Sequence, residues 1–164
     1  MMGVGKSTIG KKLSKKLELK FIDIDQIIEQ EEKTTIKEIF KNKGESYFRR
    51  IEKKTTLEEL KKNNLVVALG GGAITSTAIR REIKNSCVSF WLDLSLKLLI
   101  PRLKNSTKRP LLNHDGFEKS INKIYSERKK NYNESDYKIR CNSMDKNEIV
   151  DKIVKLYESS RNKN

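Results

Sequence analysis

The first eight residues constrain the fold more than any other stretch of the chain. The segment Gly3-Val4-Gly5-Lys6-Ser7-Thr8 contains the closing half of the phosphate-binding pattern G-x-x-x-x-G-K-[ST], the P-loop. Glycines let backbone N–H groups turn toward phosphate oxygens, and the helix that follows points the positive end of its dipole at the same anion. We therefore expect Lys6 to reach the β- and γ-phosphates of ATP and the Ser7 hydroxyl to bind Mg²⁺. The rest of the expected ATP-binding loop is Gly3, Val4, Gly5 and Thr8.

The motif is incomplete at its amino end. Counting back from Gly5, its opening glycine would fall one residue before Met1, and the strand that leads into such a loop would lie further upstream. A short Gly-Lys-Ser match also allows a plain glycine-rich turn before an amphipathic helix. The helix is supported by apolar residues at helical spacing from Ile9 to Leu17. Gly10 inside it indicates close packing against a sheet.

The rest of the chain alternates short apolar runs with amphipathic stretches. We expect strands at 20–25, 65–69, 87–92 and 137–141. The expected helices lie at 26–32, 35–40, 45–62, 77–84, 95–103, 117–131 and 145–156. Alternation of this kind predicts an α/β protein, a three-layer sandwich in which a parallel sheet is flanked by helices.

Two of the expected strands are followed by residues suited to a binding site. Asp23 and Asp25 end the first run, and on an extended strand both carboxylates would project to the same side. They suit Mg²⁺ binding and activation of a hydroxyl; alternatively one of them, for which Asp25 is suited, caps the next helix. Gly70-Gly71-Gly72 places bare backbone at the end of the second run, where open α/β sheets bind ligands.

Composition excludes several classes of protein. A chain of 164 residues is one domain, and its only histidine, His114, argues against a histidine-based metal site or catalytic triad. The net charge of +14 could mark a nucleic-acid face. However, the lysines are scattered among acidic residues, so we expect an anionic substrate and no nucleic-acid partner. No apolar run approaches the roughly 20 residues that span a bilayer, and no signal-peptide pattern is present, so we expect a cytoplasmic protein without a membrane partner.

Taken together, these features resemble shikimate kinase, a small relative of the nucleoside monophosphate kinases. The matching residues are Gly3 to Gly10, Phe21-Ile22-Asp23-Ile24-Asp25, Ile39-Phe40, Gly44-Glu45, Phe48-Arg49, Leu69-Gly70-Gly71-Gly72-Ala73, Arg109-Pro110-Leu111-Leu112 and Glu127-Arg128. They follow the family's order and nearly its spacing over most of the chain. The P-loop alone is generic, but Asp-x-Asp, Phe-Arg, Gly-Gly-Gly and Arg-Pro-Leu together are specific to this family.

The resemblance implies a magnesium-dependent kinase that transfers the γ-phosphate of ATP to the 3-hydroxyl of shikimate, in the biosynthesis of chorismate and aromatic amino acids. It also implies a monomer with one P-loop kinase domain over 1–164, substrate-binding helices within 26–62 and a lid over 104–116. The alternatives are another small-molecule P-loop kinase, such as gluconate kinase, and a truncated, non-catalytic P-loop or nucleic-acid-binding protein.

Each matching residue also receives a role from the resemblance. Asp23 would support Mg²⁺ beside Ser7, and Asp25 would orient or deprotonate the attacking hydroxyl. Arg49 and Arg128 would grip the shikimate carboxylate, where a planar guanidinium outperforms lysine. The other substrate contacts would be backbone amides of Gly71 and Gly72 and a pocket wall of Phe40 and Phe48. On the ATP side, Arg109 would close over the phosphates and Arg102 would lie near adenine, so the catalytic residues would be Lys6, Asp25 and Arg109.

The chain departs from the family in three places, of which one is the family's basic nucleotide contact after the last strand, which has no clear counterpart here. The first strand, which is central in this fold, is missing, and its loss would expose two unpaired strand edges and much apolar surface. We therefore expect the functional protein to begin upstream of Met1. Pro101 interrupts an expected helix and predicts a kink and an altered hinge before the lid.

Overall fold

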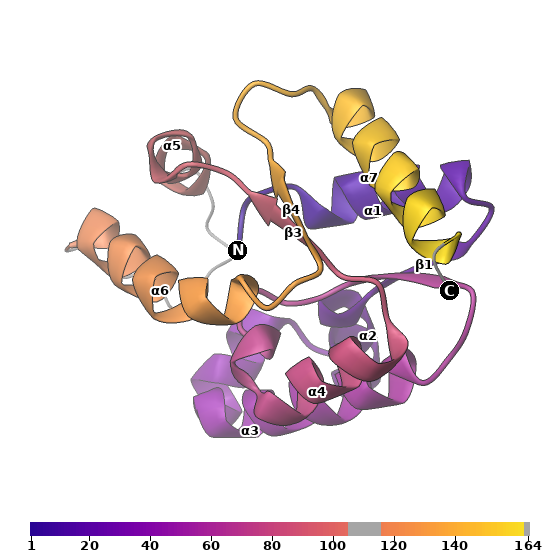
Figure 1. Cartoon of the computed structure of the whole chain (residues 1–164). Helices are drawn as coiled ribbons and strands as arrows, with labels where there is room; N and C mark the ends of the chain where they lie inside the picture. Colours follow the sequence, from indigo (N-terminus) through magenta and orange to yellow (C-terminus); the bar gives the residue numbers. More distant parts are fainter. Residues whose placement is uncertain (105–115, 163–164) are drawn as a thin grey trace.

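The computed structural model describes residues 1–104 and 116–162, over which helices and strands alternate (Figure 1). The strands are β1 (Lys20–Asp23), β2 (Leu65–Ala68), β3 (Phe90–Asp93) and β4 (Tyr137–Arg140). The helices are α1 (Lys6–Lys16), α2 (Ile24–Glu32), α3 (Ile36–Leu60), α4 (Thr77–Ser86), α5 (Leu96–Lys104), α6 (Phe117–Tyr132) and α7 (Lys146–Arg161), with a short 3₁₀ helix, η1 (Ala73–Thr75).

The strands form two parallel pairs between two helical layers. β1 pairs with β2, with Lys20 opposite Leu65, and β3 pairs with β4, with Phe90 opposite Tyr137. Helices α1 and α7 lie together on one side of the strands, and α2, α3 and α4 lie on the other (Figure 1). This arrangement confirms the expected three-layer α/β sandwich with parallel strands.

A groove separates the two strand pairs. Within the described part of the chain, β2 pairs only with β1, and β3 pairs only with β4. Residues of both β2 and β3 line a cavity of about 840 Å³, together with Leu13 of α1, Leu17 directly after that helix, and Met1. Over residues 1–104 and 116–162, no strand lies between β2 and β3, and the groove lies at that place.

Three apolar clusters hold the layers together. The largest joins α1, α5 and α7 to the β3–β4 pair through Leu13, Leu99, Ile139 and Ile153, among others. The second joins α2 to α3, and the third joins the end of α3 to α4 and η1. Gly10 lies where α1 crosses β1, and a methyl group there would collide with the Phe21 ring. The close packing expected at this glycine is thus confirmed.

The end of β1 differs from the sequence expectation. The strand stops at Asp23, whose carboxylate accepts a hydrogen bond from the backbone N–H of Asp25 at 3.1 Å. Asp23 is the N-cap of α2, and Asp25 lies in that helix's first turn. The expectation of two aspartates on one extended strand is therefore wrong, and so is Asp25 as the capping residue. A carboxylate that accepts from an unsatisfied N–H stabilises the helix start, and α2 begins at Ile24, two residues earlier than expected.

Helix α3 covers nearly all of the expected helix 35–40 and most of the expected helix 45–62. Thr35 and Glu38 form a reciprocal capping box, in which the Thr35 hydroxyl accepts from Glu38 N–H and the Glu38 carboxylate accepts from Thr35 N–H. Gly44, with φ 79° and ψ 171°, breaks the helical geometry where a stop was expected. Helix α5 contains Pro101 and continues to Lys104, so the proline does not end the helix, and the kink and altered hinge stay predictions.

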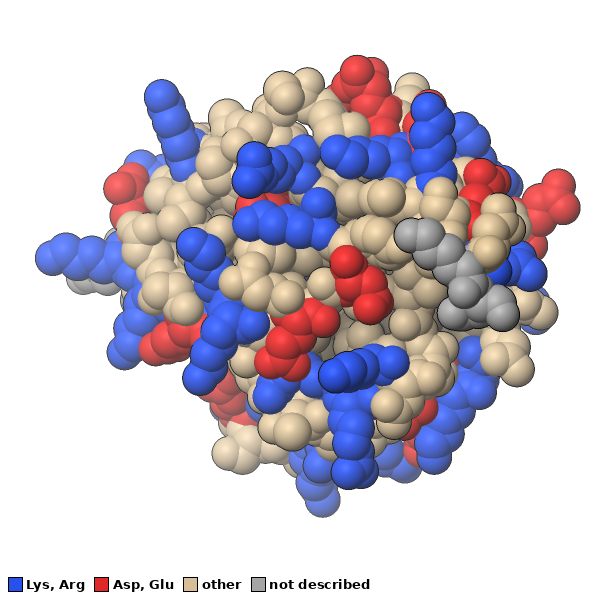
Figure 2. Space-filling model, viewed as in Figure 1, with Lys and Arg blue, Asp and Glu red and all other residues tan. Residues whose placement is uncertain are grey.

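Charged side chains are intermixed on the surface. Figure 2 shows Lys and Arg spread over the visible face with Asp and Glu among them. Surface ion pairs include Lys16–Asp151, Lys43–Glu32 and Arg80–Glu134. Over residues 1–104 and 116–162, no helix is long and apolar enough to cross a membrane.

Candidate active site

The loop before α1 has the backbone geometry that a phosphate cradle requires. Gly3 and Gly5 have φ of 73° and 91°, in the left-handed region that favours glycine. Gly5 precedes α1 without a side-chain cap, and the first turn of α1 contains no acidic residue. Lys6 folds back over the loop, where its Nζ donates to the Met1 carbonyl at 2.8 Å. An uncapped helix start beside a lysine is an anion-binding arrangement.

Ser7 and Asp23, the two expected metal ligands, lie together. The Ser7 hydroxyl donates to Asp23 Oδ2 at 2.5 Å, and Asp23 Oδ1 accepts from Asp25 N–H at 3.1 Å. These contacts join the P-loop directly to the start of α2. No cluster of three or more Asp, Glu, His or Cys side chains among the described residues could hold a metal ion. A metal at this place would therefore need ligands from outside the protein, such as phosphate oxygens.

Gly70 and Gly72 make room for neighbouring side chains, and Gly71 makes room for the backbone of Met1 and Met2. A methyl group at Gly70 would lie 2.5 Å from Glu52 Oε1 and 2.9 Å from Asp25 Oδ1. One at Gly72 would lie 2.6 Å from the guanidinium carbon of Arg49. These positions need glycine because neighbouring atoms approach the backbone closely; none of the three glycines has a positive φ. The loop thus gathers residues from α2 and α3 around bare backbone.

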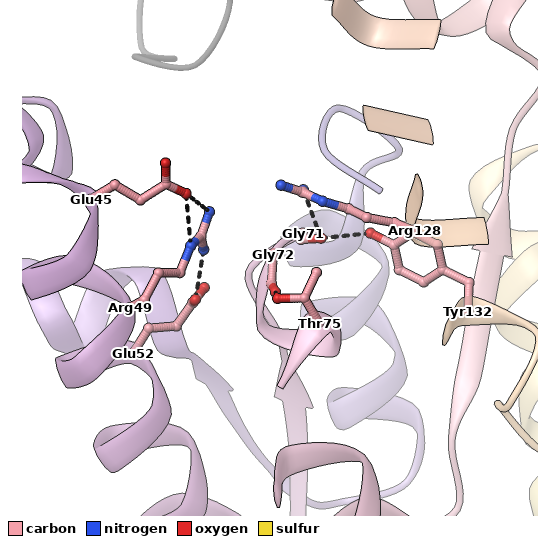
Figure 3. Close-up of polar contacts among 8 residues, drawn as sticks. All are labelled: Glu45, Arg49, Glu52, Gly71, Gly72, Thr75, Arg128 and Tyr132. Atoms are coloured by element: carbon pink, nitrogen blue, oxygen red, sulfur yellow. Dashed lines mark hydrogen bonds and ion pairs between the residues drawn. The ribbon is translucent and has the colours of Figure 1, made fainter. Parts of the chain in front are cut away.

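Arg49 is held in place by two carboxylates of its own helix (Figure 3). Its Nη1 lies 2.6 Å from Glu52 Oε2, and its Nη2 lies 3.1 Å from Glu45 Oε1. The Arg49 side chain packs over the Phe48 ring, with its guanidinium carbon 5.2 Å from the ring centroid. The guanidinium is therefore fixed beside the glycine loop before any ligand binds.

Glu52 is a buried carboxylate, with only 2% of its surface exposed. Burial raises the pKa of Glu52 above 4.5; the Arg49 charge and hydrogen bond lower it, and the nearby Asp25 raises it further. For Arg49, burial acts to lower the pKa, but Glu52 and Glu45 outweigh burial and the net shift is upward. The site thus contains a closely coupled set of charges, because Asp25, Arg49 and Glu52 share one partly dry environment.

Two side chains of α6 approach the glycine loop from the side opposite Arg49 (Figure 3). Arg128 Nη1 donates to the Gly71 carbonyl at 3.0 Å, and the Tyr132 hydroxyl donates to the same oxygen at 2.7 Å. The two arginines expected to grip a carboxylate therefore face the same three-residue loop from different helices.

The remaining expected site residues belong to the α2–α3 cluster, to α5 and to the expected lid. Phe48 is buried in the α2–α3 cluster, and Phe40 packs against it with ring centroids 4.9 Å apart. Arg102 lies on α5 with an exposed side chain. Arg109 and nearly all of the expected lid, 104–116, lie outside the described residues. The roles of Arg102 and Arg109 stay predictions.

Glu52 and Tyr132 were not expected from the sequence. Each had a signal, since Glu52 follows Arg49 by three residues and Tyr132 follows Arg128 by four, the spacings at which helical side chains are neighbours. The signal is weak, however, because a charged helix offers many such pairs. Only contact with the distant glycine loop distinguishes these two.

Comparison with known proteins agrees with this geometry. A sequence model of the shikimate kinase family matches residues 2–158. Shikimate kinase of Persephonella marina is 42% identical over 153 residues, which cover 93% of this chain and 92% of that protein. Among solved structures, shikimate kinase from Acinetobacter baumannii in complex with shikimate has a TM-score of 0.92 and 32% identity, over 97% of this chain and 89% of that one. The enzyme from Aquifex aeolicus has a TM-score of 0.86 and 30% identity, over 98% and 94%. The chain belongs to the shikimate kinase family.

Proposed function

We propose that this protein transfers the γ-phosphate of ATP to the 3-hydroxyl of shikimate, giving shikimate 3-phosphate and ADP. The observation that carries the proposal is a continuous series of contacts from the P-loop to the glycine loop. Ser7 contacts Asp23, and Asp23 contacts Asp25. Asp25 and Glu52 then border Gly70. A phosphate cradle and a carboxylate-binding pair of arginines therefore belong to one site, as a two-substrate kinase requires.

The glycine loop and its two arginines form the acceptor side of this site. Two guanidinium groups suit a small carboxylate, because each offers a planar set of N–H donors. The N–H groups of Gly71 and Gly72 have no acceptor among the described residues, so they are available to a ligand. One substrate carboxylate or hydroxyl could therefore be bound by charge and by backbone donors together. Phe40 and Phe48 would form the apolar wall beneath Arg49.

Asp25 would receive and orient the attacking hydroxyl. It sits in the first turn of α2, close to Gly70 and next to the Ser7–Asp23 contact. Phosphoryl transfer needs positioning and charge neutralisation more than covalent chemistry from the protein. A carboxylate between the phosphate cradle and the acceptor pocket can orient the hydroxyl and accept its proton.

On the ATP side, Lys6 and the loop N–H groups would hold the phosphates, and Ser7 and Asp23 would hold Mg²⁺. The residues fit this ion, because Mg²⁺ is commonly bound by one or two protein oxygens, water and substrate phosphates. Mg²⁺ would neutralise charge on the β- and γ-phosphates. Arg109 from the lid would add positive charge, and Arg102 would approach the adenine. We keep the predictions of a monomer, of a cytoplasmic location and of a single kinase domain over 1–164.

The test is ADP production from ATP and Mg²⁺ with shikimate or gluconate as the acceptor. We expect ADP release that depends on shikimate and is accompanied by the formation of shikimate 3-phosphate. ADP release with gluconate alone would favour the other small-molecule kinase. No turnover with either acceptor, together with salt-sensitive RNA binding, would favour a non-catalytic binding protein.

A further inference from the structure

The Gly71 carbonyl is bound by two donors that lie one helical turn apart. Arg128 and Tyr132 project from the same face of α6, and both are buried, with 9% and 7% of their surfaces exposed. Their donor atoms lie 3.0 Å and 2.7 Å from the carbonyl oxygen (Figure 3). The bond from Arg128 to the Gly71 carbonyl uses one of the five N–H groups of its guanidinium.

The Tyr132 ring is fixed independently of the glycine loop. It stacks on Trp91 of β3, with ring centroids 5.6 Å apart and planes at 17°. Lys138 Nζ lies 4.2 Å from the centroid of the Trp91 ring. Burial raises the pKa of Tyr132 to about 12, against the opposing charge of Arg128, so the hydroxyl stays a donor at neutral pH. The hydroxyl is thus a rigid donor whose position is set by β3.

Binding the Gly71 carbonyl also orients the next N–H group. The peptide that joins Gly71 to Gly72 is planar and trans, so its N–H points away from its carbonyl. The carbonyl faces α6, and the N–H of Gly72, which has no acceptor among the described residues, is thereby turned away from α6. Turn hydrogen bonds flank this peptide, from Ala73 N–H to the Gly70 carbonyl at 3.2 Å and from Thr75 N–H to the Gly72 carbonyl at 3.0 Å, but neither of them holds the Gly71 carbonyl itself.

We propose that Tyr132 is a positioning residue for the acceptor substrate, which acts by holding the Gly71 carbonyl so that the Gly72 N–H and the Arg128 guanidinium are aimed at the acceptor. The inference rests on the proposed function, because the acceptor is the one assigned there. It gives the Trp91–Tyr132 stack a functional consequence besides packing.

The test variant is Tyr132→Phe, which keeps the ring and its stack on Trp91 and removes only the hydroxyl. Its matched control is Tyr125→Phe, on the same helix, which removes a hydroxyl hydrogen bond to Asp93 of 3.1 Å. We expect Tyr132→Phe to raise the dissociation constant and the KM for shikimate about three- to tenfold, the effect of one neutral hydrogen bond. The KM for ATP and kcat should stay within about twofold, and Tyr125→Phe should change none of these values.

A readout that needs no turnover is the amide resonance of Gly72 in ¹⁵N-labelled protein. Tyr132→Phe should shift this resonance and Tyr125→Phe should not. Equal shikimate affinity in the two variants would overturn the inference, as would an equal fall in affinity for both substrates or loss of the folded spectrum in Tyr132→Phe. If the unmodified protein neither binds nor phosphorylates shikimate, the proposed function itself is wrong and the inference is overturned with it.

Discussion

Asp25 occupies the junction between the phosphate side and the acceptor side of the site. Its backbone N–H donates to the Asp23 cap, and its carboxylate lies beside Gly70 and interacts electrostatically with Glu52. For Asp25→Asn we expect turnover to fall by about 10²- to 10⁴-fold, because the amide keeps the size of the side chain but cannot accept a proton. Steady-state ADP production measures the loss. ATP binding by calorimetry should be retained, and unchanged turnover would remove Asp25 from its role.

A substitution at Arg49 tests whether a planar guanidinium group binds the acceptor substrate. Arg49→Lys keeps the charge beside Glu52 but loses the fork of donors, so we expect the KM for shikimate to rise at least about tenfold with kcat less affected. Arg50→Lys is the matched control, because Arg50 is exposed and lies over the Tyr47 ring, 5.0 Å from its centroid. An unaltered shikimate KM in Arg49→Lys, or the same change in both variants, would place Arg49 outside the acceptor site.

At the scale of the elements, the start of α3 depends on an ionised Glu38. Hydrogen bonds from the hydroxyls of Thr34 and Thr35 and from the Thr35 N–H lower the pKa of Glu38 to about 2. Because the pKa in the folded state is lowered, the stability that Glu38 contributes is present above its unfolded pKa of 4.5. It is lost as the pH falls from there through about 2.

We therefore expect Glu38→Gln to be less stable than the unmodified protein at neutral pH, with a difference that shrinks as the pH falls from 4.5 toward 2. Urea unfolding at a series of pH values measures this difference. Glu58→Gln serves as the control, since Glu58 is exposed on the same helix and lies 4.0 Å from Lys54. A difference that stays constant over this range would contradict the assigned capping box.

For the whole molecule, the groove between β2 and β3 is the feature that most lowers the stability of the fold. Among the described residues, one edge of β2 and one edge of β3 have no strand partner at this groove, and the walls of the groove are largely apolar. Such edges favour association and leave apolar surface unburied. A strand placed in the groove would pair with both edges and would bury its side chains on both faces. Met1 lines the groove, so a segment joined to its amino group can enter.

We expect five apolar, β-branched residues added before Met1 to raise the midpoint of thermal unfolding by roughly 5–10 °C. Each buried side chain contributes about 1.5–3 kcal/mol and each ordered residue costs about 1–2 kcal/mol, which leaves a net gain of a few kcal/mol. Calorimetry compares this protein with one that carries a Gly/Ser extension of the same length. Equal midpoints in the two proteins would show that the groove does not accept a strand.

Much of the fold and the site could be predicted from the sequence because the signals are local. Helical spacing, the Thr35–Glu38 capping box and the break at Gly44 each depend on residues within one or two turns. The glycine run could be placed at the end of an expected strand from its position alone, but the arginines could be assigned to the same site only through the resemblance to a known family. The end of β1 could not be predicted correctly, since the capping preference of Asp23 competes with strand propensity over three residues.

The sequence by itself determined the layers, the phosphate-binding loop and the chemistry of the acceptor groups, because periodicity, capping and residue type act over short distances. Tertiary structure decided which of the many charged and aromatic residues enter the site. Glu52 becomes a buried partner of Arg49 only because the glycine loop closes over it, and Tyr132 reaches Gly71, 61 residues away in sequence, only because it stacks on Trp91 of β3. These contacts depend on how segments distant in the sequence pack together, and local sequence patterns do not predict such packing.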